Sequence, residues 1–166
     1  SQHWIGEMTL DRPTSMNPVL PNEALPDANW ADAFEVSTHR DFATMREIAY
    51  TTVGTSPTWA KRLFKIRNFI VAPFGLKPDG KTDAPRSETR ISIFPILQES
   101  EDRIVLGMDD IHLNFRIIIE RFAIGGCFRI RVTTLIRRHN ILGKVYITLI
   151  TPFHKLIVVS AMRNVT

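Results

Sequence analysis

The pattern of apolar and polar residues predicts a first strand followed by two helices. Phe34 and Val36 alternate with polar neighbours, so we expect a short strand that begins near Ala33. A helix should follow, with Asp41 as its N-cap and Gly54 directly after its end. The apolar residues of this helix recur at helical spacing, at Phe42, Met45, Ile48, Ala49 and Thr52.

A second helix is expected to open with Ser56 as its cap and Pro57 at its first position. Pro73 and Gly75 should end it, and residues 61–67 make most of its surface basic. Residues 77–90 contain prolines, a glycine and several charges, which predicts a loop. The apolar stripe of the second helix is Trp59, Leu63, Ile66 and Ile70.

The second half of the chain predicts a run of antiparallel strands at residues 91–97, 103–108, 111–124 and 127–137. Gly125-Gly126 is a strong signal for a two-residue hairpin turn, in which Ile124 faces Cys127. That register places Glu120 opposite Arg131 as an ion pair on a charged, water-facing side. The residues that then share the apolar face are Leu113, Phe115, Ile117, Ile119, Ile130, Val132 and Ile136.

The chain ends with a predicted helix over residues 141–162, capped by Asn140. Pro152 removes one backbone hydrogen bond, so we expect a bend near Thr148. One side of this helix carries Val145, Leu149, Phe153, Leu156 and Ser160.

Length and composition favour a single globular domain. The 166 residues are 44% hydrophobic and 23% charged, which excludes a disordered or collagen-like chain. Residues 1–21 contain three prolines and predict an extended, mobile arm, and residues 22–166 form the domain. A lone Cys127 excludes an internal disulfide and a cysteine-rich zinc site. Cys127 has no obvious activating base, so we interpret it as a spacer residue.

Charge is distributed unevenly along the chain. The first 35 residues carry −5 and the remainder about +9, for a net charge of +4. This basic body permits weak contact with an anionic membrane surface. Aromatic residues for stacking are scarce beside the basic residues, so no nucleic-acid partner is expected. No signal peptide is evident, and Lys144, His154 and Lys155 interrupt the last apolar segment. We therefore expect a soluble cytoplasmic protein, either a monomer or a homodimer.

Five segments carry a resemblance to a known family: residues 25–28 (LPDA), 109–115 (DDIHLNF), 133–135 with 139–140 (TTL and HN), 143–146 (GKVY) and 152–154 (PFH). Together they resemble a bacterial domain-of-unknown-function family, number 2867, placed with the START and polyketide-cyclase (SRPBCC) superfamily. The resemblance covers roughly residues 22–162. It implies an α+β helix-grip fold, in which a curved antiparallel sheet wraps a long C-terminal helix and two shorter helices follow the first strand. It also implies an apolar cavity between sheet and helix, but no catalytic residues, because the family has no established activity.

Three groups of polar residues suggest chemistry. His112 beside Asp109 and Asp110 could form an acid–base pair, although its position in the strand favours the outer, polar side. His139 and His154 with either aspartate match no metal-ligand spacing, so we predict no metal site. His139 with Asn140 is better explained as fixing the corner between strand and helix.

Tyr146 and His154 lie about two turns apart on the last helix, so they share one side. They could contact a ligand, or they could satisfy buried carbonyl groups in the core. Thr134, on the apolar sheet face, is another candidate polar contact.

The sequence therefore predicts a non-enzymatic protein that binds a small hydrophobic or lipid-like molecule and needs no cofactor. The first alternative is a cyclase- or dehydratase-type enzyme in which Tyr146, His154 or His112 assists a carbonyl substrate. The second is a structural or membrane-surface protein whose cavity is filled by its own side chains. The predicted ligand contacts are Phe115, Ile117, Val132, Thr134, Tyr146, Phe153 and His154.

Overall fold

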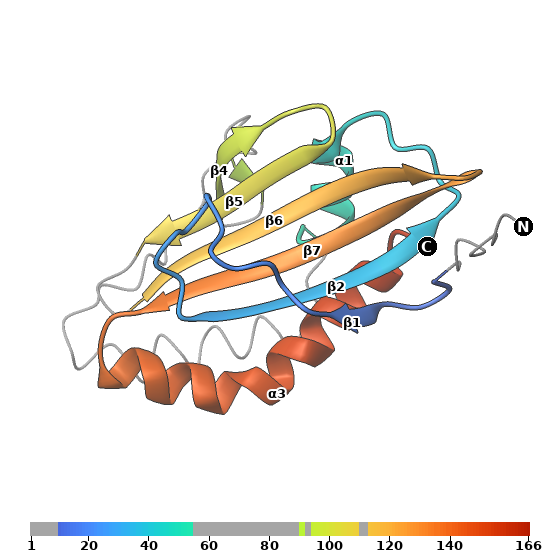
Figure 1. The fold of residues 1–166 in the computed structure, drawn as a ribbon. Helices are drawn as coiled ribbons and strands as arrows, with labels where there is room; N and C mark the ends of the chain where they lie inside the picture. The colour runs from blue at the N-terminus through green and yellow to red at the C-terminus, as the bar shows by residue number, and fades with distance from the viewer. Residues whose placement is uncertain (1–9, 55–89, 92–93, 110–112) are drawn as a thin grey trace, which may run out of the picture.

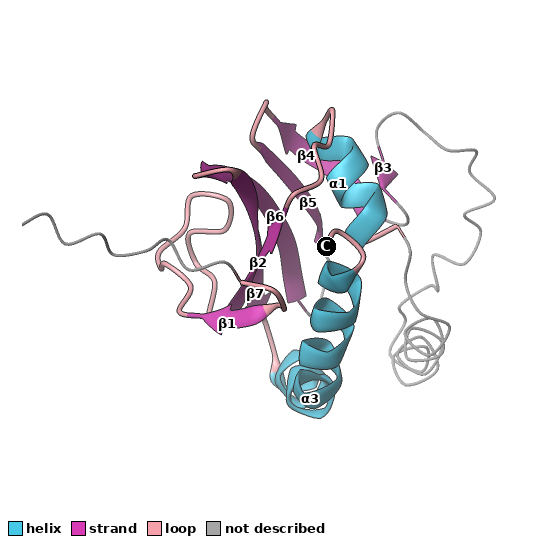
Figure 2. Cartoon of the chain, turned by 90° about the vertical axis from the view of Figure 1, so that its right-hand side faces the viewer, coloured by secondary structure: helices cyan, strands magenta, loops and turns pink. Residues whose placement is uncertain are grey.

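A computed structural model describes residues 10–54, 90–91, 94–109 and 113–166. These residues form an α+β structure with a curved, seven-stranded antiparallel sheet in the order β1-β2-β7-β6-β5-β4-β3 (Figure 1). The described helices α1 and α3 both lie on one face of this sheet (Figure 2). The elements are β1 (Thr14–Met16), β2 (Trp30–Thr38), α1 (Met45–Thr52), β3 (Arg90–Ile91), β4 (Phe94–Glu99), β5 (Arg103–Asp109), β6 (Leu113–Ile124), β7 (Cys127–Arg138) and α3 (Ile141–Arg163).

The β6–β7 hairpin confirms the register expected from the Gly-Gly turn. Ile124 pairs with Cys127 and Glu120 with Arg131, and Gly125 has a φ of 57° that suits a residue without a side chain. The ion pair formed by Arg131, however, is not the expected one with Glu120. Nη2 of Arg131 lies 2.7 Å from Oε1 of Glu35 on β2, the strand on the other side of β7.

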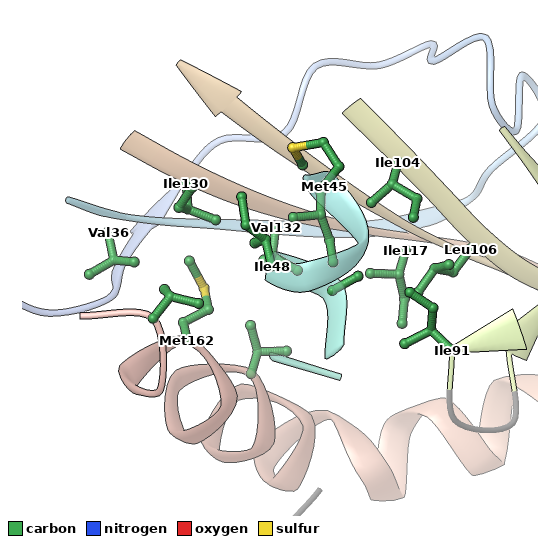
Figure 3. Close-up of a cluster of buried hydrophobic side chains, with 14 of the residues drawn as sticks. Val36, Met45, Ile48, Ile91, Ile104, Leu106, Ile117, Ile130, Val132 and Met162 are labelled. Carbon is green, nitrogen blue, oxygen red and sulfur yellow. The ribbon is translucent and has the colours of Figure 1, made fainter. Parts of the chain in front are cut away.

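The main core lies between the inner face of the sheet and the two helices (Figure 3). Met45 and Ile48 of α1 and Met162 near the end of α3 are fully buried against it. The sheet contributes alternate residues of four strands, as the predicted apolar face requires. These buried sheet residues are Phe34, Val36, Ile104, Leu106, Ile117, Ile119, Ile130 and Val132.

The outer face of the sheet carries a second apolar cluster, which corrects the prediction of a wholly water-facing side. Ile118 and Leu135 are buried there beneath Leu25, whose segment crosses the sheet with several alanines. The sequence signal is the unbroken run of Ile117 to Ile119, since a strand covered on both faces loses its alternation. The N-terminal segment is therefore a covering layer, and part of the predicted arm forms β1 against β2.

Helix α1 begins later than predicted. Its N-cap is Thr44, not Asp41, and the Thr44 hydroxyl accepts a hydrogen bond from the backbone N–H of Glu47. The Glu47 carboxylate in turn accepts from the backbone N–H of Ala43, so the two side chains satisfy the end of the helix reciprocally. The predicted second helix lies outside the described residues. So does the predicted loop at residues 77–90, except for Arg90, which begins β3.

Helix α3 has its expected cap, with Asn140 accepting from the N–H of Gly143, and Pro152 lies inside it. The helix bends along its length, as Figure 2 shows. The predicted stripe faces away from the sheet, because the buried residues of α3 are Gly143, Ile147, Val158 and Met162. Apolar residues surround most of this helix, so their spacing did not select the face that packs.

Candidate functional site

A carboxylate–imidazole pair joins the sheet to α3. Nε2 of His154 lies 3.0 Å from Oδ2 and 3.3 Å from Oδ1 of Asp32, and both side chains are mostly buried. The Trp30 ring packs edge-on against the imidazole, with 5.4 Å between the ring centres. The carboxylate and the indole therefore hold the imidazole in one orientation at the interface between the layers.

Strand β2 brings Asp32 to this position. Asp32 lies two residues before Phe34, and Phe34 belongs to the inner core, so alternation turns the carboxylate toward the same face. Its neighbour across the strands is Thr134 of β7, which is 1% exposed. The next residue in this row is Ile117 of β6. Asp32 and Thr134 thus place polar atoms within an apolar surface.

Four of the predicted ligand contacts lie together on the inner face. The pairing of β6 with β7 places Ile117 opposite Thr134, and Ile119 opposite Val132. Phe115 lies one row further along and stacks at an angle against Phe94 of β4. Phe115, Ile117, Val132 and Thr134 therefore form one patch, which reaches the Asp32–His154 pair through Thr134.

The predicted ligand contacts on α3 do not all reach the site. His154 reaches the site, whereas Phe153 is 46% exposed on the side of the helix away from the sheet. Tyr146 is half-buried two turns before His154. The prediction that Phe153 lines a space beneath the helix is therefore wrong, because one residue along a helix is a rotation of about 100°.

The other candidate residues lie elsewhere. Asp109 forms an ion pair with Arg116, with 2.6 Å between Oδ1 and Nη1, and its predicted partners Asp110 and His112 lie outside the described residues. His139 is exposed, with Nε2 3.0 Å from the side-chain oxygen of Asn114. His139 and His154 thus have different partners, Asn114 and Asp32. Among the described residues, no group of three or more histidine, cysteine, aspartate or glutamate side chains could hold a metal.

An open hollow of about 370 Å³ lies at the opposite end of β2, and none of its lining residues belongs to the predicted ligand set. Here the C-terminus joins the sheet: the Thr38 hydroxyl donates to the carbonyl of Val165, and Nη1 of Arg40 donates to that of Asn164. These contacts explain why the lining is polar, because hydrogen bonds join two segments of the chain here. The lining is Asp11, Ser37, Thr38, His39, Arg40 and Thr166.

Sequence reasoning missed Asp32 and Trp30. The predicted strand began near Ala33, whereas β2 begins at Trp30. Continuing the alternation of Phe34 and Val36 backward by one step would have placed Asp32 on the apolar face. A carboxylate at such a position needs a partner, which is the signal that could have found the site.

The sequence profile of one family, described as "Protein of unknown function (DUF2867)", matches residues 24–161. The chain belongs to the DUF2867 family. This confirms the family resemblance seen in the sequence. The matched DUF2867 region contains Trp30, Asp32, Thr134 and His154, so the whole candidate site lies within the family domain. No curated protein and no solved structure matches the chain significantly.

Proposed function

We propose that this DUF2867 protein binds a small, lipid-like molecule between the inner face of the sheet and α3. The observation that carries the proposal is the Asp32–His154 pair on an otherwise apolar face. Binding sites for small molecules are mostly apolar and use a few placed polar groups to orient the ligand. The resemblance to helix-grip proteins of the SRPBCC superfamily, which hold ligands between sheet and helix, supports the same location.

The pairing of His154 indicates which ligand group it would recognise. Its Nε2 faces the Asp32 carboxylate, which favours the tautomer with the proton on Nε2. Among the described residues, Nδ1 has no hydrogen-bond partner. A neutral imidazole in this tautomer accepts a hydrogen bond at Nδ1. The ligand is therefore an apolar molecule that carries a hydroxyl group.

Displacement of a bound hydrophobic dye tests this proposal. We expect dodecanol to displace anilinonaphthalene sulfonate from the protein, and its methyl ether, which cannot donate a hydrogen bond, to do so about tenfold more weakly. His154→Phe, which keeps a ring of similar size but has no hydrogen-bond acceptor, should remove this preference for the alcohol. The matched control is His139→Phe, which alters an exposed histidine bonded to Asn114 and should leave the preference unchanged.

Two results would contradict ligand binding at this site. One is equal displacement by the alcohol and its ether in the wild-type protein. The other is an unchanged preference in His154→Phe once circular dichroism shows that the variant folds. Native mass spectrometry of freshly purified protein adds an independent measurement, because a retained small molecule would appear as a mass difference that His154→Phe reduces.

The second candidate is a cofactor-independent enzyme of the cyclase or dehydratase type. The specific observation is the 3.0 Å contact between Nε2 and Oδ2, since a carboxylate that orients an imidazole is the arrangement a general base requires. Asp32→Asn separates the two functions. In an enzyme it should lower turnover of a carbonyl substrate at least about a hundredfold, whereas in a binding protein it should change dye displacement only slightly.

A further inference from the structure

Helix α3 presents an apolar stripe to solvent. Ile141, Val145, Leu149, Phe153 and Leu156 are spaced three or four residues apart and are between 46% and 77% exposed. This spacing keeps them on one side of the helix. Apolar patches of this kind on a protein surface mark sites of interaction with a protein or a membrane.

The charges of α3 have a single sign. The helix contains Lys144, Lys155 and Arg163 and no acidic residue. Lys144 and Lys155 are both exposed and lie eleven residues, or about three turns, apart, so they flank the stripe along the same edge. Among the described residues, the carboxylate that forms an ion pair with a side chain of this helix is Asp32, which faces His154 on the inner side.

Two acidic residues of the N-terminal segment lie on the opposite face of the sheet. Glu23 pairs there with Arg103, and Asp27 with Arg137. Among the described residues, the carboxylates of Glu23 and Asp27 therefore do not neutralise the lysines of α3, which lies on the other face of the sheet. A partner that covers the stripe meets apolar residues with cations beside them.

We propose that the outward face of α3 docks on an anionic membrane surface, with the stripe inserted among the lipids and the two lysines at the headgroups. Amphipathic helices that lie in the membrane interface combine these features. A second copy of the chain fits less well, because it would bring two helices of like charge together. This inference rests on the outward face of α3 and is independent of the ligand proposed for its inner face.

The same helix is long and apolar enough to cross a membrane by length and composition, with 17% of its most apolar window buried. Its C-terminal end, however, is held in the core, where Met162 and the following Val165 are fully buried. The backbone carbonyl of Val165 also accepts a hydrogen bond from Thr38. Spanning would break these contacts, whereas docking along the membrane surface preserves them.

Flotation with lipid vesicles tests the docking surface. The full chain should float with vesicles of equal parts phosphatidylserine and phosphatidylcholine, and much less with pure phosphatidylcholine. Leu149→Glu should lower binding at least about tenfold, and Lys144→Ser with Lys155→Ser should lower it by about tenfold or more. The matched control is Val19→Glu, which places the same charge at an exposed apolar residue outside α3 and should bind as the wild type does.

Four outcomes would overturn the proposal. The first is no flotation with the anionic vesicles, and the second is equal flotation with neutral ones. The third is a dimer in solution that Leu149→Glu converts to a monomer, which would assign the stripe to a second copy. The fourth is protein that stays with the vesicles in both high salt and alkaline carbonate, which would indicate a spanning helix. Circular dichroism checks that each variant folds.

Discussion

Gly107 of β5 lies opposite Arg116 of β6, and a side chain at this position does not fit without movement of its neighbours. A Cβ at this position would lie 2.7 Å from the backbone oxygen of Phe115 and 2.6 Å from Cδ of Arg116. The arginine side chain can move, but the backbone oxygen is fixed by the sheet. We expect Gly107→Ala to lower the free energy of unfolding by about 2 kcal/mol, measured by urea denaturation.

Gly126 supplies the control for this prediction. It lies in the β6–β7 turn, where an added Cβ would meet nothing within 4 Å. Gly126→Ala should therefore change the free energy of unfolding by less than about 0.5 kcal/mol. Equal effects of the two substitutions would show that close packing at Gly107 is not what requires a glycine there.

At the scale of single residues, the sequence located half of the polar pair. His154 could be proposed because it shares one side of the last helix with Tyr146, and this helix was expected to cover the sheet. Asp32 could not be paired with it, because the contact joins residues 122 positions apart and depends on how α3 crosses β2. Helical spacing specifies the angle between Phe153 and His154, but not which of the two faces the sheet.

At the scale of elements, the turn signal and alternation were sufficient to predict the β6–β7 register. The register followed from the Gly-Gly turn and from the alternation of the inner-face residues, because a slip by one residue would turn those apolar side chains away from the helices. Periodicity could not predict which face of α3 packs on the sheet, because apolar residues surround the helix. It also could not predict the burial of Ile118 and Leu135, because the segment that covers them has no regular pattern. The first residue of α1 was not predicted correctly, because Asp41 and Thr44 are both good capping residues.

The segment that contains Leu25 is predicted to contribute to stability as a core element does. Leu25 is 5% exposed and packs on Ile118, Leu135 and Val105. Leu25→Ala should lower the free energy of unfolding by about 3 kcal/mol, since it leaves a cavity over the outer face. Leu20→Ala, at a residue that is 47% exposed, should cost less than about 0.5 kcal/mol in the same urea titration. A small effect at Leu25 would mean that the segment is only loosely attached.

Across the whole molecule, the contrast between an acidic N-terminal segment and a basic body has a structural explanation. The segment that contains Glu23 and Asp27 lies over the outer face of the sheet, where these residues pair with Arg103 and Arg137. On the same face, Glu35 of β2 pairs with Arg131 of the neighbouring β7. The sequence revealed the charge asymmetry but not its consequence, because complementary charges also suit a partner molecule. Here the two regions of one chain neutralise each other.

These ion pairs are expected to differ in strength according to burial. The Glu35 side chain is 11% exposed, and Oε1 lies 2.8 Å from Nε of Arg131, with Arg129 3.9 Å from Oε2. Glu35→Gln should therefore lower the free energy of unfolding by about 2 to 3 kcal/mol, because it leaves arginine charge partly buried without a carboxylate. Glu23→Gln and Asp27→Asn, whose side chains are 82% and 64% exposed, should each cost less than about 1 kcal/mol.

Added salt distinguishes the buried Glu35 pair from the exposed pairs when the free energy of unfolding is measured. Exposed pairs are screened by added salt, so the small losses in Glu23→Gln and Asp27→Asn should vanish in concentrated sodium chloride. The loss in Glu35→Gln should persist, since water and ions reach that carboxylate poorly. If the Glu35→Gln effect also vanished with salt, the Glu35–Arg131 pair between β2 and β7 would behave as an exposed pair, and its burial would not explain its contribution to stability.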